Sequence, residues 1–75
     1  MTAAQIWSPT TEAFDGGLLR IAILERGWTL TEFAEATGLT ETTVYAAVRG
    51  RAVQDRTAIR IFRTLAQREP VRIAS

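Results

Sequence analysis

The middle of the chain carries two short runs of apolar residues at helical spacing, separated by one glycine. The first run places these residues on one face of a helix: Leu30, Phe33, Ala34 and Thr37. The second run, which follows Gly38, places three more on one face: Val44, Ala47 and Val48. This pattern predicts two short helices joined by a tight turn, with a polar face left over on the second helix.

Residues typical of helix ends surround the two runs. Thr29 and Glu32 form a T-x-x-E capping box, so the first helix should begin near Leu30. Gly38 suits the positive φ angle of a helix end, and the Thr40 hydroxyl can cap the next helix. Together with a small residue at position 34 and a β-branched one at 44, these signals describe a helix-turn-helix.

One further helix is predicted on each side. The first should run from about Gly16 to Arg26, with Asp15 as a possible cap and Gly27 at its end. It is apolar almost all round, so either the N-terminal segment covers it or it contacts a second subunit. The other should run from about 56 to 68, capped by Asp55. Its core face consists of Ala58, Ile61, Phe62 and Leu65. Its outward face carries Arg56, Arg60 and Arg63, of which we expect Arg60 and Arg63 to be solvated.

The two ends of the chain show no long periodic pattern. Residues 1–15 form an N-terminal arm in which Ser8-Pro9 could open a turn of helix. Its apolar residues Ile6, Trp7 and Phe14 should lie over the core; the alternative is an arm that contacts a partner subunit or DNA. Residues 70–75 form a tail that either frays or adds a short strand at 71–73. The predicted fold is an all-α compact bundle of four to five short helices, with its domain at residues 16–69.

Length and composition exclude several functions. Seventy-five residues allow one domain with a thin core. Cysteine and histidine are absent, so we expect no disulfide, no metal site and no nucleophile that those residues activate. We therefore expect neither enzymatic activity nor a cofactor. The chain has no apolar run long enough for a membrane span and no signal peptide pattern, so an intracellular, cytoplasmic protein is expected.

The charge is distributed unevenly along the chain, although the net charge is only +1. Residues 1–48 hold two arginines against six acids, whereas residues 49–75 hold seven arginines against two acids. All nine basic residues are arginine, whose planar guanidinium suits phosphate and guanine. A GC-rich genome would also favour arginine over lysine, but it would not explain the clustering.

The predicted helix-turn-helix resembles that of the phage Cro/repressor and xenobiotic-response-element (XRE) regulators. The matching residues are Ala34, Gly38, Leu39, Val44 and Ala47, with Phe33 at a usual apolar site. Gly27-Trp28-Thr29 is similar to the run that opens the family's second helix, and Arg49-Gly50-Arg51 to the run that closes the third. Thr37 and Glu41 depart from the family pattern. The resemblance implies a lambda-repressor-like fold that binds double-stranded DNA.

The polar face of the second helix, about residues 41–49, would then enter the major groove. Thr40 and Thr42 can bond to phosphates or bases, and Glu41 can accept a hydrogen bond from a cytosine amino group. Tyr45 can reach a phosphate or a thymine methyl group. Ala46 is small enough for a close approach to the base edges.

Further DNA contacts are expected beside this face. Arg49 and Arg51 are candidates for guanine or backbone contacts. Arg56, at a helix N-terminus, is a candidate for a phosphate contact. The backbone N–H groups of Leu30 and Thr31, at the start of the preceding helix, should meet another phosphate.

The expected function is sequence-specific transcriptional regulation, by a small repressor or Cro-like protein or a mobile-element switch. A homodimer is expected, and a regulatory protein is a further candidate partner. The alternative is a protein–protein interaction module or antitoxin-like partner that keeps the helix-turn-helix fold, which the low net charge and Glu41 favour. An RNA binder is less well supported, because Tyr45 is the one residue placed to stack on a base.

Overall fold

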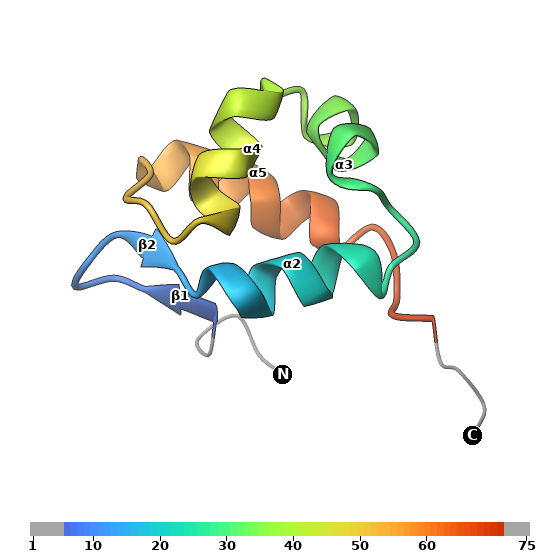
Figure 1. Cartoon of the computed structure of the whole chain (residues 1–75), viewed down its shortest axis with the longest axis horizontal. Coiled ribbons are helices and arrows are strands. Elements are labelled where there is room, and N and C mark those ends of the chain that lie inside the picture. The colour runs from blue at the N-terminus through green and yellow to red at the C-terminus, as the bar shows by residue number, and fades with distance from the viewer. Residues whose placement is uncertain (1–5, 72–75) are drawn as a thin grey trace.

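The structure, a computed structural model, describes residues 6–71 (Figure 1). In this range a short hairpin precedes four helices. The strands are β1 (Trp7–Ser8) and β2 (Ala13–Phe14), and the helices are α2 (Gly16–Leu24), α3 (Leu30–Thr37), α4 (Glu41–Val48) and α5 (Asp55–Leu65). The predicted helical bundle with a helix-turn-helix is confirmed. The all-α expectation is broadly consistent with these helices, to which the structure adds the small two-stranded hairpin.

The four helices enclose one small core. The largest fully buried side chains are Leu19, Ile23, Phe33, Val44 and Ile61. They come from all four helices. α3 packs against α2, α4 and α5, and α4 packs against α2 as well. Burying apolar area from every helix at one centre is what makes so short a chain fold, since each helix alone would be marginal in water.

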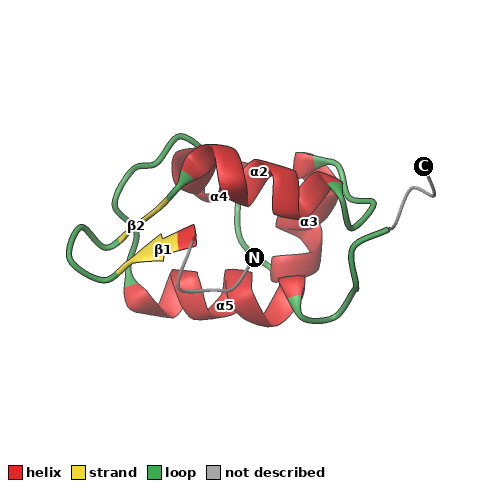
Figure 2. Cartoon of the chain, turned by 90° about the horizontal axis from the view of Figure 1, so that it is seen from below, coloured by secondary structure: helices red, strands yellow, loops and turns green. Residues whose placement is uncertain are grey.

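The N-terminal segment forms a hairpin, so the predicted turn of helix at Ser8-Pro9 is wrong. Trp7 pairs with Phe14 and Ser8 with Ala13 in antiparallel register. The rings of Trp7 and Phe14 pack against Phe62 of α5, with centroids 6.5 and 5.3 Å from its ring. The hairpin therefore lies at the end of the molecule where α5 begins (Figure 2). Ile6 and Phe14 are buried, which confirms that this segment lies over the core.

Three predicted helix ends differ from the structure. α2 ends at Leu24 rather than at 26, because the chain turns through residues 25–27 and Gly27 takes a φ of +84°. The N-cap of α5 is Gln54, and Asp55 is the first helical residue, so Asp55 does not cap that helix. α5 ends at Leu65, well before the proline predicted to stop it. At the C-terminal end, Val71 lies in no strand, and residues 72 and 73 fall outside the described residues.

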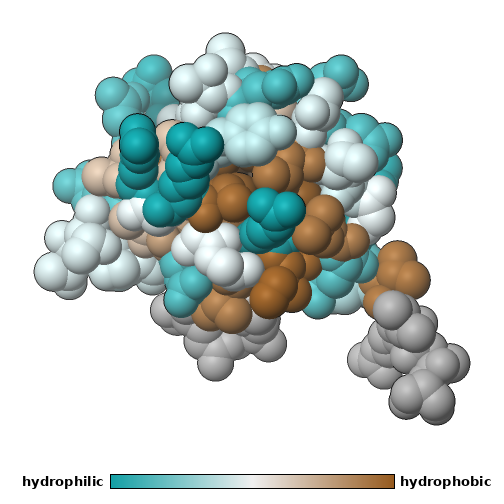
Figure 3. All heavy atoms as spheres, in the orientation of Figure 1, coloured by the Kyte–Doolittle hydropathy of each residue, from teal (hydrophilic) through white to brown (hydrophobic). Residues whose placement is uncertain are grey.

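The first helix keeps part of its apolar surface uncovered. Leu19, Ala22 and Ile23 are buried, but Ile21 and Leu24 remain 51% and 48% exposed. Brown apolar atoms are visible over the α2 side of the molecule in Figure 3. Because β2 packs on α4 and the hairpin rings pack on α5, the described part of the N-terminal segment does not account for this exposed face. The second-subunit alternative stays open.

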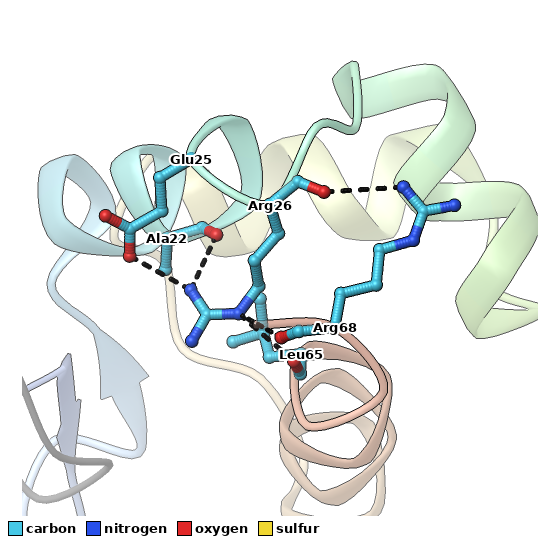
Figure 4. A network of polar contacts seen from close by, with 5 residues as sticks. All are labelled: Ala22, Glu25, Arg26, Leu65 and Arg68. Atoms are coloured by element: carbon cyan, nitrogen blue, oxygen red, sulfur yellow. Dashed lines mark hydrogen bonds and ion pairs between the residues drawn. The ribbon is translucent and has the colours of Figure 1, made fainter. Parts of the chain in front are cut away.

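Two arginines tie the end of α5 to the loop before α3 (Figure 4). Arg26 donates from Nε to the carbonyl oxygens of Leu65 and Arg68, both at 3.1 Å, and from Nη1 to that of Ala22 at 2.9 Å. Arg68 donates back to the Arg26 carbonyl at 3.4 Å, and its guanidinium lies 4.3 Å from the Trp28 ring centroid. Of these acceptors, the Ala22 and Leu65 carbonyls lie in the last turns of α2 and α5, where carbonyl groups have no i+4 helical partner.

None of the helices in residues 6–71 has both the length and the apolar character that a membrane crossing requires.

Candidate nucleic-acid interface

The turn between α3 and α4 is built from its own polar groups. Gly38 takes a left-handed φ of +75°, which ends α3. The buried Thr37 hydroxyl donates to the Ala34 carbonyl at 2.8 Å and accepts from the Leu39 N–H at 3.1 Å. Thr37 departs from the family pattern, yet its hydroxyl is fully used. It fastens the turn with hydrogen bonds where a larger residue would do so by apolar contact.

Arg60 of α5 forms a hydrogen bond to the same turn. Its Nη1 donates to the Thr37 carbonyl at 3.3 Å. Arg60 is exposed, as predicted for this face of α5, but its guanidinium also bonds within the fold. A cation near the last carbonyls of a helix also interacts favourably with the helix dipole. The spacing of α5 could not reveal this contact, because the partner lies 23 residues earlier in the chain.

Thr40 caps the start of α4, together with Thr43. Thr40 accepts a hydrogen bond from the Thr43 N–H at 3.2 Å, and the two hydroxyls lie 3.0 Å apart. The predicted cap is confirmed, and it engages the Thr40 hydroxyl within the protein. Glu41 follows as an exposed acid in the first helical turn, where its charge complements the helix dipole. Glu41, which departs from the pattern that the helix-turn-helix resembles, therefore has a favourable local role at the start of α4.

The two faces of α4 differ as the pattern predicted. Val44 and Ala47 are buried beneath the helix, and Val48 is half-buried. On the other side Thr42 and Tyr45 are exposed, and Ala46 is half-buried. The polar face thus points away from the core and can meet a partner.

Five of the predicted site residues line one shallow hollow on that face. They are Thr42, Tyr45, Ala46, Arg49 and Arg51. Ala46 is small enough to leave the hollow open, and the two arginines bring positive charge to it. The hollow offers several hydrogen bond donors: one hydroxyl, one phenol and two guanidinium groups. Base edges and phosphates carry acceptors for such donors.

The end of α4 fixes where Arg51 lies. Gly50 takes a φ of +78°, its N–H donates to Ala47, and the Arg51 N–H donates to Ala46, both at 3.0 Å. This paired bonding is the Schellman arrangement, which folds the chain back over the last helical turn. Arg51 is therefore held beside the helix rather than carried away from it.

The start of α3 shows the predicted capping box. Thr29 Oγ1 accepts from the Glu32 N–H at 3.1 Å, and Glu32 Oε1 accepts from the Thr29 N–H at 2.9 Å. The bond that the Thr29 backbone N–H donates to the carboxylate lowers the pKa of the Glu32 carboxyl below its usual 4.5, and the nearby Thr29 side chain acts in the same direction. The box leaves the N–H groups of Leu30 and Thr31, the first two of the helix, as the candidates for a phosphate.

The structure places the remaining candidates outside the hollow. Thr40 and Glu41 precede it at the start of α4, and Arg56 is exposed as the second residue of α5. Among the described residues, no group of acidic side chains is arranged to hold a metal ion.

Comparison with known proteins agrees with this geometry. A family model described as helix-turn-helix matches residues 19–69, which include α3, α4 and all three residues of the turn between them. Neither the curated proteins nor the solved structures include a significant match to the chain. Since the matched residues make up more than half of the sequence, the chain belongs to the XRE-type helix-turn-helix family.

Proposed function

We propose that this protein is a sequence-specific regulator of transcription that binds double-stranded DNA through α4. The observation that carries the proposal is the hollow formed by Thr42, Tyr45, Ala46, Arg49 and Arg51 on the exposed face of the second helix of a helix-turn-helix. The family to which the chain belongs supports DNA as the partner. An α-helix fits the major groove of B-DNA, where each base pair presents its own pattern of donors and acceptors.

In this proposal α4 contacts the bases, and the starts of α3 and α5 contact the DNA backbone. Arg49 and Arg51 contact guanine or phosphate, and Tyr45 contacts a phosphate or a thymine methyl group. The N–H groups of Leu30 and Thr31 bind a phosphate at the start of α3. Arg56 binds another phosphate from the start of α5.

We further propose that the protein acts as a homodimer on an inverted repeat. Exposed Ile21 and Leu24 on α2, and Ile59 on α5, are apolar groups that a second subunit would remove from water. The same exposed groups support the second candidate function, a protein-interaction module or antitoxin-like partner.

Selection from a random double-stranded DNA library tests the proposal. The wild-type chain should enrich an inverted repeat with half-sites about one helical turn apart. The double variant Arg49→Ala/Arg51→Ala, with α5 and the hairpin unchanged, serves as the matched control and should enrich nothing. A single asymmetric site would retain DNA binding but contradict the dimer. No enrichment by the wild-type chain, even at low salt, would reject DNA binding and favour the interaction module.

The dependence on salt separates the two functions. DNA binding should weaken steeply as salt rises, because each neutralised phosphate releases counterions. Association through the apolar face of α2 should depend little on salt, since it buries uncharged groups. Titration of the enriched sequence at several salt concentrations provides this measurement.

A further inference from the structure

The hairpin before α2 is joined to the loop that follows α4. Ala13 of β2 forms a bridge with Ala52, and the Val53 N–H donates to the Glu12 carbonyl at 2.9 Å. Residues 52–53 thus lie beside β2, joined to the hairpin by one isolated β-bridge and one further backbone hydrogen bond. The residue just before this pairing is Arg51, one of the residues that line the hollow on α4.

The hairpin itself is held firmly by the core. Phe14 is buried, and its ring lies 4.9 Å from that of Trp7 and 5.3 Å from that of Phe62. The Asp15 N–H donates to the Ile6 carbonyl at 2.8 Å, which closes the hairpin at its base. Because the core holds the hairpin in place, the bonds between the hairpin and residues 52–53 also hold that loop in place.

Glu12, whose carbonyl accepts the bond from Val53, has an unusual backbone conformation at the end of the hairpin turn. Glu12 has a φ of +54°, and it is the one residue other than glycine with a positive φ among residues 6–71. Residues with a side chain rarely adopt this conformation. The Glu12 carbonyl is the group that accepts from Val53, so the unfavourable conformation coincides with the bond to the loop.

We propose that the β1–β2 hairpin positions Arg51 for DNA binding. Arg51 is held from two sides: its own N–H is bonded to Ala46 of α4, and the two residues after it pair with the hairpin. Because the backbone of Arg51 is already held in position, less conformational entropy is lost when its side chain binds a phosphate or a base. The hairpin lies outside the matched residues 19–69, so this device is additional to the helix-turn-helix. The inference rests on the proposed DNA-binding function.

A pair of substitutions at Glu12 tests the proposal. In Glu12→Pro the ring fixes φ near −65°, which turns the carbonyl away from Val53. In Glu12→Gly the positive φ is allowed. Both variants remove the same exposed carboxylate, so they differ in the backbone alone. On the DNA sequence enriched by the wild-type chain, Glu12→Pro should weaken binding several-fold and Glu12→Gly should bind as the wild type does.

The same comparison in the Arg51→Ala background shows whether the hairpin acts through Arg51. There Glu12→Pro should cause no further loss. If Arg51 contacts a phosphate, the salt slope of Glu12→Pro should also fall by about 0.9, the value for one phosphate contact. A loss of binding that persists in the Arg51→Ala background would overturn the proposal, because the hairpin would then act in another way.

A second variant guards against a failure of Glu12→Pro to fold, which circular dichroism would reveal. Val53→Pro removes the N–H donor of the same bond, and Gln54→Pro, whose native φ is −67°, is its matched control. Val53→Pro should weaken binding and Gln54→Pro should not. Equal affinities would overturn the proposal. If the wild-type chain itself binds no DNA, the proposed function fails, and that result is distinct from a failure of the hairpin's role.

Discussion

Gly16 and Val48 meet backbone to backbone where the start of α2 crosses the end of α4. A Cβ atom at Gly16 would collide with the carbonyl oxygen of Val48 and lie 2.8 Å from its carbonyl carbon. The close approach is possible because glycine has no side chain. It lets the first turn of α2 lie directly against the last turn of α4, just before Arg49 and Gly50.

Gly16→Ala should lower the free energy of unfolding by about 1–3 kcal/mol, because the added methyl group has no space between two backbones. Gly17→Ala is the matched control. There the nearest atom to a new Cβ is Asp15 Oδ1 at 3.6 Å, an ordinary contact. That variant should gain about 0.4–1 kcal/mol from a less flexible unfolded chain. Urea denaturation of both variants gives the comparison, and equal stabilities would contradict the close contact.

Arg49→Ala should weaken binding to the selected DNA by about 1–3 kcal/mol if Arg49 reads a guanine. The preference at one base pair should relax at the same time. Arg63→Ala, which removes the same charge from the exposed surface of α5, should have a much smaller effect. Fluorescence anisotropy with labelled duplexes measures both. An unchanged affinity for Arg49→Ala would remove this residue from the interface.

Val44→Asp should unfold the domain. Val44 is 1% exposed beneath α4, so the substitution places an unpaired carboxylate in the core, which costs several kcal/mol. A domain of this size has little stability to spare. Thr42→Asp, on the exposed face of the same helix, should melt normally. A cooperative melting curve for Val44→Asp, followed by circular dichroism, would show that the burial is wrong.

Acidification should weaken the start of α3. The pKa of the Glu32 carboxyl is lowered in the folded state, mainly by the Thr29 backbone N–H. Its contribution to stability is therefore present above about pH 4.5 and is lost as the pH falls through the lowered value. Glu32→Gln should flatten that part of the dependence, and Glu35→Gln, exposed on the same helix, serves as the control. Identical pH profiles for Glu32→Gln and the wild type would exclude this contribution.

Arg26→Lys should lower the free energy of unfolding by about 1–2 kcal/mol, although it keeps the charge. A lysine ammonium cannot reach the carbonyl groups of Ala22, Leu65 and Arg68 at once, as the planar guanidinium does in Figure 4. Arg20→Lys makes the same exchange at an exposed site of α2 and should be nearly neutral. If both variants shift the urea midpoint equally, the hydrogen bonds of the Arg26 guanidinium do not contribute to the stability.

The sequence predicted best those features that depend on near neighbours. The capping box of Thr29, the left-handed Gly38 and the Thr40 cap all involve contacts within about four residues, so the residue types at fixed spacing were sufficient. The polar face of α4 followed from helical periodicity in the same way. Its contacts with DNA stay a prediction.

Features that depend on distant partners were missed. The hairpin has two-residue strands, which are too short to show an alternating pattern. Its bridge to Ala52 joins residues 39 positions apart, which no local pattern reports. Arg60 bonds to Thr37, and Arg26 to Leu65, across separations that periodicity does not report. Three arginines outside the predicted DNA contacts thus bond to backbone carbonyls within the fold: Arg26, Arg60 and Arg68.

The placement of the chain's two tryptophans gives the protein a pair of independent optical reporters. Trp7 belongs to the aromatic cluster of the hairpin, whereas Trp28 is buried against Phe33 and Arg68 beside the capping box of α3. With Trp7→Phe, the emission would follow the helix-turn-helix alone, and with Trp28→Phe it would follow the hairpin. Loosening of the hairpin could then be timed separately from loss of the DNA-reading helices, within a single small domain.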